Sequence, residues 1–147
     1  MEEFNNIEKV KALFASVNGL GNENLFFVAC QDKEKVSGAA AGMEYPYDGL
    51  LINMTENGLG FFYLKQAGIV LTQNLAKMTL DKDSYTFISN DEIKNVTVKK
   101  FALLNSKVKR ISIDTADKSY KLFAKIEEKD IPYQTDNFTK FIEKYSK

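Results

Sequence analysis

The chain has 147 residues, of which 44% are hydrophobic, and these values fit a single domain that builds one core without disulfides or a structural metal. Lysine plus arginine and aspartate plus glutamate each number 20, so the net charge is zero and no global field draws the protein toward nucleic acid or membrane. The longest strongly apolar stretch, residues 25–30, is far shorter than the roughly 20 residues of a membrane-spanning helix.

The start of the chain and its single cysteine indicate the compartment. The first residues, Met1-Glu-Glu-Phe-Asn, are acidic and do not have the cationic and apolar regions of a secretion signal. Cys30 lies in an apolar run, where a buried and unreactive thiol is expected, and a lone cysteine forms no internal disulfide. We therefore expect a cytoplasmic protein.

Residues 2–17 have apolar side chains at every third or fourth position, which predicts an amphipathic helix through Phe4, Ile7, Val10, Phe14 and Val17. The Gly- and Asn-rich residues 18–22 end that helix. We therefore divide the chain into an N-terminal helix and turn, residues 1–22, and a main domain, residues 23–147. Residues 25–30 are apolar on both faces and predict a strand that is covered on both sides.

A hairpin is the clearest local feature of the main domain. Residues 50–55 and 59–65 flank a turn in which Asn57 and Gly58 are expected to supply the positive φ angles of type I′ geometry. The aromatic residues 61–63 are consecutive, so at least one of them must point away from the interior of a strand pair. An exposed aromatic side chain beside the turn is therefore expected, as a contact for a partner.

Two segments show no single pattern. Residues 31–48 have neither a helical nor a strand period and predict a long loop. Residues 66–83 fit a helix through Leu71, Leu75 and Met78, or a strand through Ala76, Met78 and Leu80, so both interpretations stay open.

The rest of the chain predicts four strands and a helix. Residues 85–89, 95–99 and 110–114 alternate with period two, and after a polar turn the next strand carries Tyr120, Leu122 and Ala124 on its inward face. Beyond Pro132, Thr135 or Asp136 is expected to cap a final helix with apolar positions Phe138, Phe141, Ile142 and Tyr145.

About seven strands followed by one C-terminal helix is the element order of pleckstrin-homology-like domains. Residues 85–101 and 109–123 resemble the bacterial, GRAM-related members of that superfamily, in which a strand leads to an acidic-Ile corner, here Glu92-Ile93. The resemblance covers residues 50–145. It implies a mainly β (α+β) fold, a bent antiparallel barrel of about seven strands capped by the C-terminal helix, to which the N-terminal helix is an addition.

The same resemblance implies a non-enzymatic module that binds proteins or, in some members, acidic lipids. Phosphoinositide-binding members carry a basic Lys-X(n)-Lys/Arg-X-Arg pattern across their first hairpin. That pattern is missing here, because Lys33 and Lys35 alternate with Asp32 and Glu34 and no arginine follows.

One stretch is strongly basic. Residues 94–125 hold nine basic and two acidic side chains, a net charge of +7 in a chain whose total is zero. A candidate surface for an anion or a partner consists of Lys99, Lys100, Lys107, Lys109, Arg110 and Lys121. The alternative is that these side chains only keep exposed strands soluble and resist edge pairing.

The residue inventory limits the chemistry. Without histidine there is no Ser-His or Cys-His pair, and one cysteine cannot supply a zinc site. Asp81, Asp83 and Glu92 match positions 1, 3 and 12 of a calcium loop, but Tyr85 and Thr86 occupy positions 5 and 6, where the loop requires an oxygen ligand and a glycine. We therefore interpret the three acids as solvated turn carboxylates before a strand.

The leading interpretation is a non-enzymatic protein-interaction or scaffolding module of the bacterial cytoplasm, with self-association through the N-terminal helix or an exposed strand edge. The first alternative is peripheral binding to acidic lipid headgroups through residues 94–125. The second is a carboxylate-dependent hydrolase around Asp81, Asp83 and Glu92. No catalytic residue, cofactor or metal is expected. Nucleic acid is not expected as a partner, because the basic stretch has no aromatic platform and no recognition helix.

Overall fold

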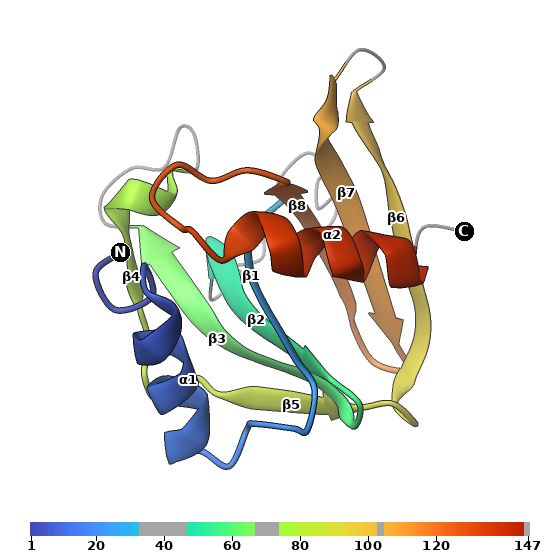
Figure 1. Ribbon diagram of the computed structural model, residues 1–147. Coiled ribbons are helices and arrows are strands. Elements are labelled where there is room, and N and C mark those ends of the chain that lie inside the picture. Colours follow the sequence, from blue (N-terminus) through green and yellow to red (C-terminus); the bar gives the residue numbers. More distant parts are fainter. Residues whose placement is uncertain (33–46, 67–73, 103–104, 146–147) are drawn as a thin grey trace.

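The computed structural model describes residues 1–32, 47–66, 74–102 and 105–145. Two α-helices, one short 3-10 helix and eight strands follow one another along the chain (Figure 1). They are α1 (Ile7–Ser16), β1 (Asn24–Gln31), β2 (Gly49–Thr55), β3 (Gly58–Gln66), η2 (Leu75–Lys77), β4 (Met78–Leu80), β5 (Thr86–Ser89), β6 (Ile93–Ala102), β7 (Asn105–Thr115), β8 (Ser119–Lys125) and α2 (Gln134–Tyr145).

The strands form one antiparallel sheet in the order β4-β3-β2-β1-β8-β7-β6. Strand β5 pairs with the first half of β3, on the same edge that β4 uses at the other end of β3. The sheet bends into two limbs, a first limb with β1, β2 and β3 and a second limb with β6, β7 and β8. Helix α2 crosses the opening between them (Figure 1). A mainly β fold with one helix at each end of the sequence was expected and is confirmed. The sheet is not a closed barrel, because in the part of the chain that the structure describes it ends at β4 and β5 on one side and at β6 on the other.

The inner face of the bent sheet holds the larger core. Strand side chains from both limbs meet there, and α2 closes the core with Phe138 and Phe141, which are almost fully buried. The Phe27 ring of β1 stacks on Phe138 with 5.0 Å between ring centroids. Ile142 and Tyr145 pack at the rim of the same core, so all four apolar positions predicted for the last helix face the sheet.

A second core lies on the outer face of β1, β2 and β3, beneath α1. Phe4, Val10 and Phe14 are buried there, and Ile7 and Val17 pack at its edge, as the helical period predicted. The helix is shorter than the predicted 2–17, because the side chain of Asn6 accepts hydrogen bonds from the first-turn N–H groups and so sets the start. Because the two cores cover both faces of β1 and β2, the sequences of these strands are almost continuously apolar.

The consecutive aromatic residues of β3 divide between the two cores. Phe61 lies in the inner core, whereas Phe62 lies beneath α1, with its ring centroid 5.1 Å from that of Phe14. Tyr63 is half-buried at the inner core. The expectation of an exposed aromatic among residues 61–63 is therefore wrong, because α1 covers the face that Phe62 occupies. The exposed aromatic beside the turn is Phe87 of β5, which is 43% exposed.

The turn between β2 and β3 also differs from the expectation. Thr55 pairs with Gly58, so the two loop residues are Glu56 and Asn57. Gly58 has a positive φ of 149°, whereas Asn57 does not have a positive φ, so the predicted type I′ turn is wrong. A Cβ at Gly58 would clash with the carbonyl oxygen of Ile88, so the close approach of β5 requires glycine at this position.

Buried polar contacts hold the two limbs together at the start of α2. Strands β1 and β8 pair at only two positions, Cys30 with Phe123 and Gln31 with Leu122. Where the two strands diverge, the fully buried side chain of Gln134 bridges them by hydrogen bonds to their backbones. Its Oε1 accepts from the N–H of Val28 at 2.9 Å, and its Nε2 donates to the carbonyl oxygens of Val28 at 3.0 Å and Lys125 at 2.9 Å.

The predicted start of the last helix is wrong by one or two residues. The helix begins at Gln134, so Thr135 and Asp136 lie in its first turn and not at its cap.

The structure decides only part of the two segments for which the sequence showed no single pattern. Residues 33–46 and 67–73 lie outside the described residues, so the predicted loop is untested there. Farther along, the strand interpretation is confirmed at β4, where Met78 and Leu80 are buried.

Candidate binding surface

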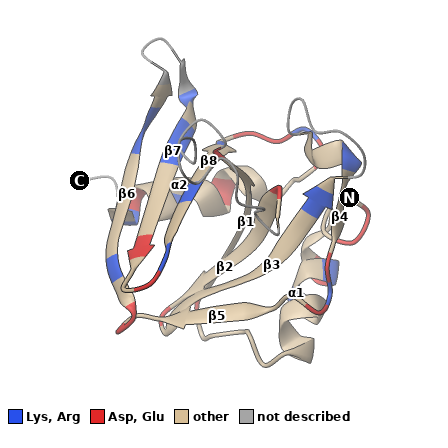
Figure 2. Ribbon diagram, turned by 180° about the vertical axis from the view of Figure 1, so that it is seen from behind, with Lys and Arg blue, Asp and Glu red and all other residues tan. Residues whose placement is uncertain are grey.

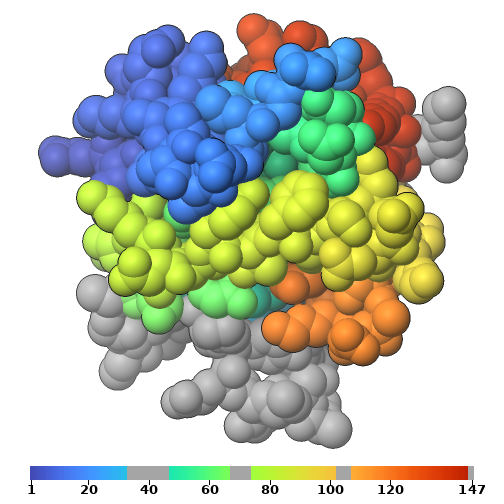
Figure 3. Space-filling model, turned by 90° about the horizontal axis from the view of Figure 1, so that it is seen from below, coloured from blue at the N-terminus to red at the C-terminus, as the bar shows by residue number. Residues whose placement is uncertain are grey.

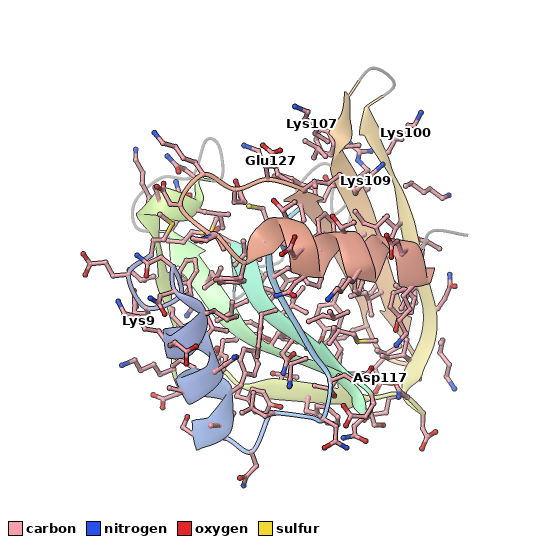
Figure 4. The ribbon with its side chains drawn as sticks, viewed as in Figure 1. Lys9, Lys100, Lys107, Lys109, Asp117 and Glu127 are labelled. Atoms are coloured by element: carbon pink, nitrogen blue, oxygen red, sulfur yellow. The ribbon has the colours of Figure 1, made fainter. Side chains whose placement is uncertain are left out.

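The six predicted basic residues all lie on β6, β7 and β8, but the sheet divides them between its two faces. Because side chains alternate along a strand and Val98 and Ile111 point into the inner core, their immediate neighbours point outward. Lys99, Arg110 and Lys121 therefore lie on the outer face. By the same alternation Lys100 and Lys109 lie on the inner-face side of the β6–β7 hairpin, whereas Lys107 lies past a register shift, nearer to the far end of the hairpin (Figure 4).

On the outer face, Arg110 is held by a buried carboxylate. Its Nε lies 3.2 Å from Oδ2 of Asp32, whose side chain is only 3% exposed. The guanidinium also stacks over the Phe101 ring, 4.6 Å from the ring centroid, and Phe101 in turn packs against Phe123. The backbone N–H of Asp32 donates to the carbonyl oxygen of Lys121, so this contact extends the junction of β1 and β8. Arg110 thus stabilises the seam between the limbs.

Lys121 is also paired. Its Nζ donates to Oγ of Ser112 at 2.5 Å and lies 3.7 Å from Oδ1 of Asp114. These side chains, with Asp32 and Lys99, line a shallow groove of about 460 Å³. Since carboxylates neutralise both Arg110 and Lys121, the outer face is not an uncompensated anion site.

The far end of the β6–β7 hairpin is different, because there lysines face one another. The register places Lys100 directly opposite Lys109, and Lys99 opposite Arg110. The ion pairs of the described residues engage Arg110 and Lys121 but none of Lys99, Lys100 and Lys109. Basic residues lie along both strands of this hairpin (Figure 2). The predicted six-residue surface is therefore two structures: a charge-compensated groove and a lysine-rich hairpin end.

The long free edge of β6 was not located by the sequence analysis, which named an exposed edge only in general terms. Strand β6 pairs with β7 over ten residues and, within the described ranges, pairs with no other strand. Its register shifts between Ile93 and Asn95 and again between Lys100 and Ala102, so a regular stretch lies between two bulges. The edge follows from the strand order of the sheet, which the sequence pattern does not give.

The three acids considered for a hydrolase do not form a site. Asp81 lies 3.7 Å from Nζ of Lys65 and accepts from the N–H of Asp83 in the turn before β5. Glu92 lies beyond the other end of β5, where its carboxylate accepts from the N–H and hydroxyl of Ser89. Among the residues with assigned positions, no three Cys, Asp or Glu side chains are grouped to hold a metal ion. The acids act as turn residues.

Strand β5 crosses one end of the molecule beside α1 and the loop that follows it (Figure 3). Phe87 and Leu20 are the exposed large hydrophobic residues of the described chain. Phe87 belongs to β5 and Leu20 to the loop after α1, so apolar exposure at this end comes from single residues of two separate segments.

Cys30 lies at the β1–β8 seam, beside a cavity of about 380 Å³. Its thiol is free and buried. Desolvation, with a smaller effect of the nearby Glu128 carboxylate, raises the pKa of Cys30 to about 12. A thiol with that pKa is protonated at neutral pH and is a poor nucleophile, as expected from its apolar sequence context.

Neither helix has the dimensions of a membrane span: no helix among the described ranges is long and apolar enough to cross a bilayer. Comparison with known proteins finds no matching family model, no matching curated protein and no matching solved structure.

Proposed function

We propose that this protein is a non-enzymatic protein-interaction module whose docking element is the free edge of β6. One observation carries the proposal: β6 is long, lies at the end of the sheet and uses only one of its two edges among the described residues. A free edge presents backbone N–H and C=O groups that an extended segment of a partner can pair with.

The other end of the sheet is less suited to this role. Strands β4 and β5 share the edge of β3, and they contain three and four residues. The turn before β5 further occupies that edge: the side-chain hydroxyl of Ser84 accepts from the N–H of Tyr63, and the backbone N–H of Asp81 donates to the carbonyl oxygen of Tyr63. A partner strand gains more hydrogen bonds at β6.

Charge favours an acidic partner segment. Lys94, Lys99 and Lys100 are exposed along β6. An acidic extended segment would pair with these side chains while it pairs with the backbone. Two copies of β6 placed edge to edge would instead bring six lysines together, so self-association through this edge is disfavoured.

The proposal includes a pleckstrin-homology-like, GRAM-related fold. Two features support it: the strand order, and the position of α2 in the opening of the bent sheet with Phe138 and Phe141 buried. The proposal also includes a bacterial cytoplasmic setting, which the free, buried thiol of Cys30 supports, since such thiols are typical of reducing compartments.

The test combines capture with mapping of the contact. The full chain is used as bait in native bacterial lysate, and each captured protein is identified by mass spectrometry. Hydrogen–deuterium exchange is then measured with and without the purified partner. We expect slower exchange in β6, residues 93–102, and unchanged exchange in β4, residues 78–80, which is the matched control edge of the same sheet.

The proposal is wrong if the captured partner protects α1, β4 or β5 and leaves β6 unchanged. It is also wrong if repeated capture yields no partner that binds the purified chain. A partner segment without acidic residues would overturn the charge assignment alone.

A further inference from the structure

The N-terminal ends of α1 and α2 approach each other (Figure 1). The hydroxyl of Tyr133, just before α2, donates a hydrogen bond to the carbonyl oxygen of Phe4, just before α1. A groove of about 730 Å³ lies between the two helix ends, and every residue that lines it belongs to the described chain. Ligand sites in proteins commonly have volumes of about 300–1,000 Å³, so the groove has the size of such a site.

The fold holds both walls of the groove in place. On one side, the side chain of Asn6 caps α1 by accepting from two N–H groups of the first turn. On the other side, the three hydrogen bonds of Gln134 anchor the start of α2. The contact between Tyr133 and Phe4 joins the two walls directly. The groove is therefore formed before a ligand enters it, which lowers the entropy cost of binding.

Three polar side chains of the groove have no partner within the described chain. Asn5, beside α1, and Asn137, on α2, are half-buried, and Asp136 is exposed. None of the three side chains makes a hydrogen bond or an ion pair with another described residue. Each amide can donate two hydrogen bonds and accept two, whereas the carboxylate only accepts. The two walls thus present free hydrogen-bonding groups to the same space.

The remaining lining is apolar or charge-compensated. Phe26 and Tyr133 are buried beneath the groove, and Pro132 exposes its ring beside it. The Lys11 ammonium lies 4.0 Å from the Glu8 carboxylate. The basic residue of the lining is therefore paired with an acid, and the groove has no excess of positive charge that would hold an anion.

We propose that this groove binds a neutral saccharide of one or two rings. A hydroxyl group both donates and accepts, so neighbouring hydroxyl groups match Asn5, Asp136 and Asn137, whose acceptor positions outnumber their donors. The C–H face of a sugar ring fits the exposed ring of Pro132. An anion would be repelled by Asp136, and an apolar ligand would leave both amides unpaired.

The proposal does not rest on the protein-interaction function. No residue of β6 lines the groove, so a saccharide and a partner strand would use different parts of the molecule. A failure to bind saccharides would leave the role of the β6 edge untouched.

Nuclear magnetic resonance titration of the isotope-labelled full chain tests the proposal. Maltose, cellobiose and N,N′-diacetylchitobiose are each added to tens of millimolar. We expect at least one of them to shift the backbone signals of residues 5–8 and 132–137 and the side-chain amide signals of Asn5 and Asn137, with saturation. The signals of β6 should stay unchanged. If none of these disaccharides shifts the groove signals, the proposal is wrong.

Two further ligands test the chemistry of recognition. The O-permethylated form of the bound disaccharide keeps its acceptors but has no O–H donors. Because the oxygens of Asp136 and of the two amides would then have nothing to accept from, the affinity should fall about tenfold or more. Undiminished binding overturns the proposal. Tighter binding of the cation putrescine than of the disaccharides would assign the groove to amines and also overturn it.

The variant Asn137→Ala separates binding from folding. Its affinity for the disaccharide should fall about five- to tenfold, because one set of hydrogen bonds to the ligand is lost. Its melting temperature should be equal to or above that of wild type, since alanine favours the helix and the Asn137 side chain has no partner in the described chain. Asn5→Ala on the opposite wall should show a similar loss of affinity, which keeps the test valid if Asn137→Ala folds poorly.

The matched control makes the same substitution outside the groove. Asn95 is exposed on β6, and Asn95→Ala should leave the affinity within about twofold of wild type. Unchanged affinity in both groove variants, or an equal loss in Asn95→Ala, would show that the saccharide binds elsewhere, and the assignment to the groove would be wrong.

Discussion

The two limbs of the sheet are built from similar strands but are covered differently. Strands β1, β2 and β3 have apolar cores on both faces, because α1 packs on the outside and α2 closes the inside. Strands β6, β7 and β8 contribute to a core mainly through their inner face. On their outer face Phe123 packs against the edge of the second core, and the remaining surface carries the paired charges of Arg110 and Lys121. The difference predicts that substitutions in the first limb cost more free energy of unfolding than comparable substitutions on the outer face of the second.

The comparison also explains where the molecule is vulnerable. Only two residue pairs join β1 to β8, and Gln134 and the Asp32–Arg110 pair complete that junction. The loss of free energy of unfolding should therefore differ between substitutions in the first limb, at the junction and at the periphery.

The largest effect is expected from a paired test of the two outer faces. Phe62→Ala removes a fully buried ring beneath α1 and should lower the free energy of unfolding by about 3–5 kcal/mol. Phe101→Ala removes a half-buried ring on the outer face of β6 and should cost about 1 kcal/mol. Urea denaturation of both variants gives the comparison, and equal losses would contradict the difference between the limbs.

At the junction, Gln134→Leu should lower the free energy of unfolding by about 2–3 kcal/mol. The change leaves three backbone groups without their hydrogen-bond partner: the buried N–H and C=O of Val28 and the part-buried C=O of Lys125. The neighbouring exposed residue supplies the control, since Thr135→Ala should change stability by less than about 0.5 kcal/mol. Thermal melting followed by circular dichroism checks both, and a neutral Gln134→Leu would show that α2 is anchored by its aromatic residues alone.

A smaller loss is expected for Asp32→Asn. The variant removes the charge that pairs with Arg110, but the Arg110 side chain is 23% exposed and regains some solvation, so a loss of about 1–2 kcal/mol is expected. The double variant Asp32→Asn/Arg110→Gln should be no less stable than Asp32→Asn. Urea denaturation of the single and double variants measures the coupling, and additive losses would exclude it.

The smallest effect on stability is expected at the turn between β2 and β3, which contains Glu56. The Glu56 carboxylate accepts from the N–H groups of Glu23 and Asn22, and these hydrogen bonds hold its pKa below the ordinary value of 4.5. The stabilisation is complete above that ordinary value and disappears as the pH falls through the lower folded-state pKa. Wild type should therefore exceed Glu56→Gln in melting temperature at neutral pH, and the difference should shrink below pH 4.5. A difference that does not depend on pH would refute this explanation.

Several parts of this protein could be predicted from the sequence, because they depend on local periods. The helical stripe from Phe4 to Phe14, the doubly apolar β1 and the apolar positions of the last helix all follow from which side chains share a face. The same rule shows that Lys99 and Lys100, as neighbours in a strand, must point to opposite faces. This rule alone divides the predicted basic surface between the two faces of the sheet.

The sequence by itself therefore determined the two α-helices, most of the longer strands, their apolar faces and the basic character of residues 94–125, but it left η2 and β4 open. Only the tertiary structure decided that α1 buries Phe62, that Asp32 neutralises Arg110, and that Gln134 bridges β1 and β8. These contacts join residues that are far apart in the chain, such as the 106 positions between Val28 and Gln134. A period reports which face a side chain occupies, but which residue it meets there depends on how the sheet bends and on which strand becomes its edge.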